Sequence, residues 1–132
     1  MNIPNDLLYT RDHEWLRVSG GEGSMGITDY AQGELGDIVF LDLPDVGTKV
    51  SQGKSFGSIE AVKAAADLNA PVSGEILAVN PALEHAPETI NQSPYGDGWI
   101  VKIKLSTPAD TANLLDPRSY AAWVEQSHGE SH

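Results

Sequence analysis

One stretch decides the fold, Ile59-Glu60-Ala61-Val62-Lys63-Ala64-Ala65-Ala66-Asp67-Leu68, because the local structure of this stretch determines the setting of Lys63. Local rules favour a helix. Three consecutive alanines have the highest helix propensity, and Lys63 stands at helical pairing distance from both Glu60 and Asp67. On this interpretation Lys63 is an ordinary surface lysine, and nothing in the periodicity of the stretch contradicts it.

The other lysines are weaker candidates for a special role. Lys102 and Lys104 alternate with apolar residues, which is typical of the solvated face of a strand. Lys49 and Lys54 flank a turn. The role of Lys63 therefore has to be settled by its wider surroundings.

On both sides of this stretch the sequence predicts short strands and helices. The clearest strand contains Trp99, Val101, Ile103 and Leu105, which alternate with lysines and should line the core. Residues 38–43 are a near-continuous apolar run, so we expect a buried strand there. Further strands are expected at residues 15–18, 25–27 and 72–79, and a loop with about one helical turn at residues 84–98.

Helix signals are clear at three places. Thr28 or Asp29 is a suitable N-cap for a short helix that reaches Leu35 and is closed by Gly36. The pairs Thr107-Pro108 and Asp116-Pro117 each predict an N-cap followed by proline at the first helical position.

Many short strands between glycine and proline turns predict a mainly β barrel-sandwich with short flanking and C-terminal helices. We expect a single domain over residues 1–132. Residues 1–9 should be a lead-in, residues 107–126 should hold the C-terminal helices, and the polar tail 127–132 should be frayed.

Composition excludes several classes of function. The chain has no cysteine, which rules out disulfides, thiolate catalysis and cysteine-based zinc sites. Its net charge of −11, with only 8 Lys and Arg, argues against nucleic-acid binding. No run is long enough for a membrane helix, and residues 1–10 do not resemble a signal peptide. We therefore expect a soluble protein of the bacterial cytoplasm with no membrane or nucleic-acid partner.

Two short motifs do not carry the chemistry that they suggest. Residues 21–26 match G-x-G-x-x-G, but a strand and a helix cap follow, so we interpret them as a hairpin loop. His13-Glu14 begins like a zinc-protease motif, yet Arg17 stands where the second histidine is needed. No G-x-S-x-G elbow is present. We expect no metal site and no catalytic residue.

Residues 57–64 followed by residues 67–75 resemble the lipoylation segment of glycine cleavage H proteins. The resemblance covers about the first four fifths of the chain, in order and without large gaps, and an extended match is more specific than any short motif. The further matching segments are His13-Glu14-Trp15, Gly26 to Ala31, Gly36 to Val39, Leu43-Pro44, Asn80 to Leu83, Asn91, Ser93-Pro94-Tyr95 and Gly98-Trp99.

This resemblance implies a lipoyl/biotinyl-carrier-like barrel-sandwich hybrid of two small antiparallel sheets. Val62-Lys63-Ala64 is then the tip of a hairpin, against the local helix propensity, and lipoate is amide-linked to Lys63. Glu14 and Asp67 stand at positions that resemble the family's arm-contacting carboxylates, and His13 belongs to the same expected cleft.

The family also implies a function. The expected protein is a non-catalytic, monomeric carrier in glycine catabolism and one-carbon metabolism. It takes the aminomethyl group of glycine from the pyridoxal-phosphate glycine decarboxylase (P protein) to the folate-dependent aminomethyltransferase (T protein). Dihydrolipoyl dehydrogenase (L protein) then reoxidises the arm, which lipoyl-attaching enzymes have installed.

Other classes remain as alternatives. A biotinyl carrier shares the hairpin lysine, but its lysine is normally flanked by methionines, whereas Val62 and Ala64 flank Lys63. A lipoyl domain of a 2-oxoacid dehydrogenase usually belongs to a longer chain. A small enzyme or an interaction module predicts an unmodified Lys63, and a role in lipoyl relay is also compatible with the sequence.

Overall fold

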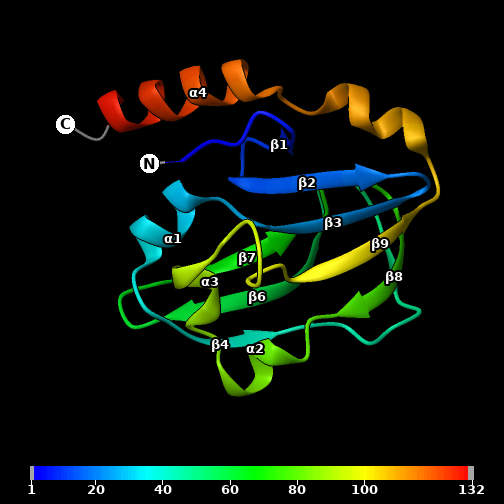
Figure 1. Ribbon diagram of the computed structural model, residues 1–132, viewed down its shortest axis with the longest axis horizontal. Helices are drawn as coiled ribbons and strands as arrows, with labels where there is room; N and C mark the ends of the chain where they lie inside the picture. The colour runs from blue at the N-terminus through cyan, green and yellow to red at the C-terminus, as the bar shows by residue number, and fades with distance from the viewer. Residues whose placement is uncertain (1, 131–132) are drawn as a thin grey trace.

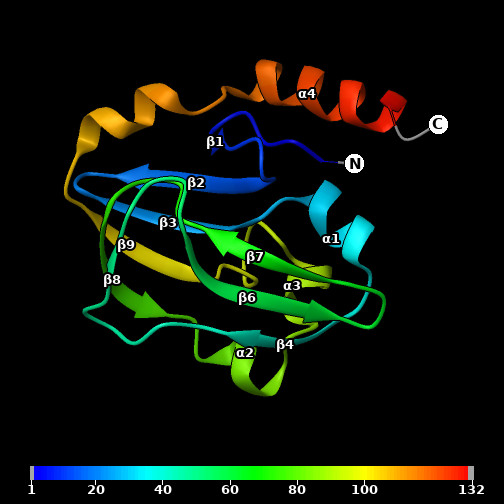
Figure 2. The same cartoon turned by 180° about the vertical axis from the view of Figure 1, so that it is seen from behind.

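The computed structural model describes residues 2–130, and its strands form two antiparallel sheets (Figures 1 and 2). The larger sheet has the order β1-β2-β3-β9-β8-β5 and the smaller sheet the order β4-β6-β7. The strands of the larger sheet are β1 (Leu8–Tyr9), β2 (Glu14–Ser19), β3 (Glu22–Ile27), β5 (Lys49–Val50), β8 (Gly74–Val79) and β9 (Val101–Leu105). Those of the smaller sheet are β4 (Ile38–Asp42), β6 (Ser55–Ala61) and β7 (Ala65–Asn69).

The main hydrophobic core joins the two sheets. Met25 and Ile103 of the larger sheet and Ile59 and Leu68 of the smaller one are almost completely buried in the same cluster. The expected fold class is confirmed, although neither sheet closes on itself, so the molecule is an open sandwich rather than a closed barrel.

The helices are α1 (Asp29–Leu35), α2 (Ala82–His85), α3 (Thr89–Gln92), the 3-10 helix η1 (Pro108–Asn113) and α4 (Pro117–Glu130). Helix α4 lies against β1 of the larger sheet, and α2 lies against β4 of the smaller one (Figure 1). As predicted, Thr28 caps α1 by accepting a hydrogen bond from the Ala31 amide at 3.2 Å, and Gly36 ends the helix with a φ of +79°. None of the helices within residues 2–130 is long and apolar enough to cross a membrane.

Both chain ends contain secondary structure. The expected lead-in includes β1, which pairs with β2 and buries Tyr9 against Tyr120 of α4 at a ring separation of 4.5 Å. Helix α4 extends to Glu130, within the segment 127–132 that is expected to be frayed, and Met1 and residues 131–132 lie outside the described residues. Composition indicated a polar tail, but it could not show that Tyr120 and Val124 anchor this helix in a second core cluster.

Residues 38–43 were interpreted as a buried strand. The segment does form a strand, but most of its side chains are not buried. Ile38 is buried, whereas Val39 and Phe40 are 50% and 56% exposed. The reason is that β4 is the terminal strand of the smaller sheet, so only part of it meets the core.

Two smaller differences concern the segment before β9 and the start of that strand. Residues 84–98 were expected to hold about one helical turn, but α2 and α3 supply two short ones. The predicted alternation holds from Val101 to Leu105, yet Trp99 is only half-buried and Ile100 is the buried residue at that end.

Candidate functional site

The stretch that decides the fold forms a β-hairpin, and the local helix expectation is wrong. Strands β6 and β7 pair in the register Glu60 with Ala65, and the Ala61 amide donates to the Ala64 carbonyl at 2.8 Å, so Val62 and Lys63 form the turn. The hairpin prevails over helix propensity because it buries Ile59 and Leu68 in the common core.

Lys63 is exposed at the tip of this hairpin, beside Val62, whose side chain is 73% exposed. In Figure 2 the β6–β7 turn lies beside the loop that leaves α1. The Val62 amide donates to the carbonyl of Asp37 at 3.0 Å. A Cβ atom placed on Gly36 would lie 3.2 Å from Cε of Lys63, so the lysine stem lies along the end of α1.

Glu14 occupies an interior position rather than the wall of an open cleft. Its side chain is 1% exposed, and its two oxygens accept hydrogen bonds from the Asn69 amide at 2.9 Å and from Oγ1 of Thr10 at 3.0 Å. Burial raises the pKa of Glu14 to about 8, although these two hydrogen bonds oppose the shift. The carboxyl therefore joins the end of β7 to the segment before β2.

Asp67 lies in a different environment from Glu14. It pairs across the smaller sheet with Ser58 of β6, which in turn pairs with Asp42 of β4, and these residues share the outer face of that sheet. Asp67 is exposed, whereas the next residue, Leu68, points into the core. Of the two predicted carboxylates, only Asp67 is open to solvent beside the hairpin.

His13 is held by residues from two helices. Its Nδ1 lies 2.9 Å from the hydroxyl of Tyr120 in α4, and its ring centroid lies 4.7 Å from that of Tyr30 in α1. The same Tyr120 hydroxyl lies 2.6 Å from Oγ1 of Thr28. The backbone of His13 has a φ of +68°, a strained conformation for a residue with a Cβ. Partial burial lowers the pKa of the imidazole.

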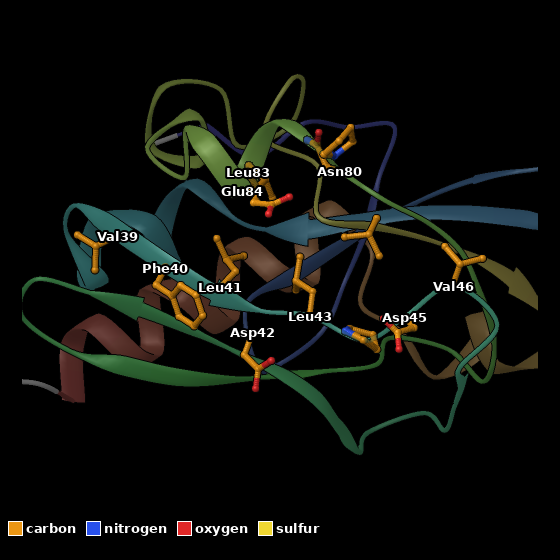
Figure 3. A pocket seen from close by; sticks show the side chains of 13 residues that line it. Val39, Phe40, Leu41, Asp42, Leu43, Asp45, Val46, Asn80, Leu83 and Glu84 are labelled. Atoms are coloured by element: carbon orange, nitrogen blue, oxygen red, sulfur yellow. The ribbon is translucent and has the colours of Figure 1, made fainter.

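A groove of about 520 Å³ lies on another part of the surface, between β4 with its following loop and residues 79–84 (Figure 3). Its lining combines apolar residues such as Val39, Phe40 and Leu43 with the acidic residues Asp42, Asp45 and Glu84. None of Lys63, Glu14, Asp67 and His13 lines this groove. Within residues 2–130, no group of three or more acidic or histidine side chains is placed to hold a metal ion.

The arrangement offers one covalent attachment point for a cofactor, the exposed amine of Lys63. The residues on either side of the turn, Ala61 and Ala64, have small side chains and leave the amine accessible. The turn itself is anchored through the Val62 amide. Such a site can carry an acyl group on the Lys63 amine while the backbone of the turn stays in place.

Comparison with known proteins gives consistent matches over almost the whole chain. Residues 7–127 match the family model described as the glycine cleavage H-protein. A glycine cleavage system H protein from Rubrobacter xylanophilus is 52% identical over 124 residues, which are 94% of this chain and 96% of the relative. One from Chlorobium luteolum is 56% identical over 122 residues, which are 91% of this chain and 95% of the relative.

The fold is also found among solved structures. A crystal structure of a glycine cleavage system H protein from Mycobacterium marinum superposes with a TM-score of 0.83 at 39% sequence identity. The superposition covers 96% of this chain and 99% of that chain. The similarity therefore concerns the complete fold and not a single motif.

Proposed function

This chain belongs to the glycine cleavage H-protein family, and from that premise we propose that Lys63 is the residue to which lipoate is attached. The family supplies the lipoyl carrier of the glycine cleavage system, so the protein is a carrier and not itself a catalyst. The observation that carries the proposal is the exposed lysine at the tip of the β6–β7 hairpin.

The residues around Lys63 suit this cofactor. An amide bond to lipoate requires an accessible amine, and the exposed Lys63, between Val62 and Ala64, provides one. When attached, the dithiolane supplies the sulfur chemistry that a chain without cysteine lacks. The hydrogen bond between Val62 and Asp37 holds the root, so that the long arm can move while its attachment point does not.

The partners that follow from this proposal are the pyridoxal-phosphate decarboxylase, the folate-dependent aminomethyltransferase, dihydrolipoyl dehydrogenase and the lipoyl-attaching enzymes, all in the bacterial cytoplasm. The net charge of −11 and the exposed carboxylates near the tip, Asp37, Glu60 and Asp67, suit docking to basic surfaces. A tethered arm also presents its cargo at a high effective concentration once the carrier has docked.

The attachment is tested by peptide mapping of protein produced in cells supplied with lipoate. We expect the added mass of one lipoyl group on the peptide that contains Lys63 and on no other lysine. Lipoate on Lys49 or Lys54, which are also exposed, would contradict the proposal. A wholly unmodified protein in the presence of an active lipoyl-attaching enzyme would also contradict it.

We further propose that the loaded arm is protected on the carrier, with distinct roles for the expected cleft residues. Asp67 is the exposed carboxylate that meets a cationic cargo, because hydrogen bonds between ions are the strong kind. Glu14 acts indirectly, through its hydrogen bond to Asn69 at the end of the same strand. His13 borders α1 through its contact with Tyr30.

This arrangement is tested by the rate at which the isolated carrier loses its aminomethyl cargo. Asp67→Asn should speed the loss because the charge is removed, and Glu14→Ala should do so because β7 loses its anchor. Both variants should still accept lipoate. Glu125→Ala, an exposed acid on α4, is the control and should behave as the wild type. Equal rates in all three variants would place the protecting cleft elsewhere.

A further inference from the structure

The side-chain amide of Asn91, in α3, makes three hydrogen bonds at the end of α1. Its Nδ2 donates to the carbonyl of Gly36 at 2.9 Å and to Oε1 of Gln32 at 3.0 Å. Its Oδ1 accepts from the amide of Ile38 at 2.9 Å. Nε2 of Gln32 donates to Asp29 at 2.8 Å, which turns the Gln32 oxygen towards Asn91. The network thus requires an amide at position 91, with both of its N–H groups in use.

The bonds of Asn91 hold both ends of residues 36–38, which we call the tip support. Each residue of this segment meets one of the hairpin residues 61–63. Gly36 lies under the stem of Lys63, the carbonyl of Asp37 accepts from the Val62 amide, and Ile38 pairs with Ala61. Asn91 is therefore connected to Ala61, Val62 and Lys63 through one short segment, although it lies in another part of the sequence.

We infer that Asn91 is a positioning residue for the arm, because it fixes the tip support and so sets the direction in which the Lys63 side chain leaves the surface. This inference rests on the proposed function, in which Lys63 bears lipoate. An enzyme that acylates or visits the lysine must meet it in a defined geometry, and a displacement of about 1 Å far from the chemistry can cost about 100-fold in rate. The position of a functional side chain depends on the residues that hold its backbone in place.

The alternative is that Asn91 only stabilises the fold, and the experiment has to distinguish this role from positioning of the arm. The carbonyls at the end of a helix need partners, and Asn91 supplies one to Gly36. If that were its whole contribution, its loss would lower stability without changing how enzymes use Lys63. The two roles differ in whether enzymatic acylation suffers while the simple chemical reactivity of the same amine does not.

The decisive variant is Asn91→Asp, which has the same shape and can still accept from Ile38 but has lost both donors. Asn113→Asp is the matched control, because Asn113 also donates to a glutamine oxygen, that of Gln52, at 3.0 Å. We expect hydrogen exchange of the Val62 amide to become about tenfold faster in Asn91→Asp only. We also expect kcat/KM for enzymatic lipoate attachment to fall about tenfold, while acetylation of Lys63 by a small activated ester stays within about twofold.

Unchanged exchange at Val62, or a kcat/KM within about twofold of the wild type, would overturn the inference. Parallel losses in enzymatic and chemical acylation would also overturn it, since they would indicate reduced access rather than misplacement. If Asn91→Asp does not fold, Gln32→Met removes one acceptor of the same amide and is judged by the same measurements. Absence of lipoate on Lys63 in the wild type would refute the proposed function, whereas the exchange result would still report on the tip support.

Discussion

Lys63→Arg protein is expected to fold like the wild type and to have no carrier activity. Arginine keeps the length and the positive charge, but its guanidinium stays protonated and cannot become the amide of lipoate. Lys63 is exposed and contributes little to packing, so the change should alter the free energy of unfolding by no more than about 0.5 kcal/mol. The loss of function would then belong to the missing attachment point alone.

The measurement is glycine decarboxylation coupled to the purified partner enzymes, with lipoylated wild-type protein as the reference. Lys54→Arg, at an exposed lysine just before β6, is the control and should keep full activity. Activity in Lys63→Arg above the level without carrier would show that another group bears the cargo.

Features set by neighbouring residues could be predicted from the sequence. The start and end of α1 follow from a threonine cap and a glycine that adopts a positive φ. Strand β9 follows from the alternation of Val101, Ile103 and Leu105 with lysines. In each case the deciding interaction lies within a few residues, so local patterns are sufficient.

The hairpin could not be derived in this way. Its turn has none of the usual turn residues, and its alanines favour a helix. What decides its conformation is pairing with β4 and burial of Ile59 and Leu68 between the two sheets, which are long-range effects. Only the resemblance to a family placed Lys63 at a tip.

The surroundings of the site were also beyond local rules. His13 meets Tyr120, which is 107 positions away, and Glu14 meets Asn69, which is 55 positions away. Asn91 was matched to the family in sequence, but nothing in its neighbours indicates that it supports the tip. Contacts of this kind appear only once the sheets have assembled.

A second large effect is expected for the stability of the protein as pH rises, and its source is Glu14. The pKa of this buried carboxyl is raised from 4.5 to about 8 in the folded protein. Between these values the folded state binds a proton that the unfolded state has lost. The contribution of Glu14 to the free energy of unfolding is therefore largest below about pH 4.5. It declines by about 1.4 kcal/mol per pH unit until the pH exceeds the pKa of Glu14 in the folded protein.

Glu14→Gln removes the titrating group but cannot keep both hydrogen bonds. Oγ1 of Thr10 already accepts from the Asp12 and Glu14 amides at 3.2 Å, so its hydroxyl can only donate to the side chain of residue 14. A glutamine with its oxygen towards the Asn69 amide turns its NH2 group, which cannot accept, towards that hydroxyl. The variant should therefore be less stable than the wild type near pH 5 by about 1 kcal/mol. Between pH 5 and pH 8 its free energy of unfolding should rise relative to the wild type by up to about 4 kcal/mol.

Urea unfolding of both proteins at several pH values measures this difference, with Glu125→Gln on the exposed face of α4 as the control. Parallel pH profiles for wild type and Glu14→Gln would mean that Glu14 is ionised in the fold and that its two accepted hydrogen bonds outweigh burial. Diverging profiles would mean that Glu14 is largely neutral at pH 7. A neutral carboxyl cannot pair with a cation on the arm, so Asp67 would then be left as the charged partner and Glu14 as the anchor of its strand.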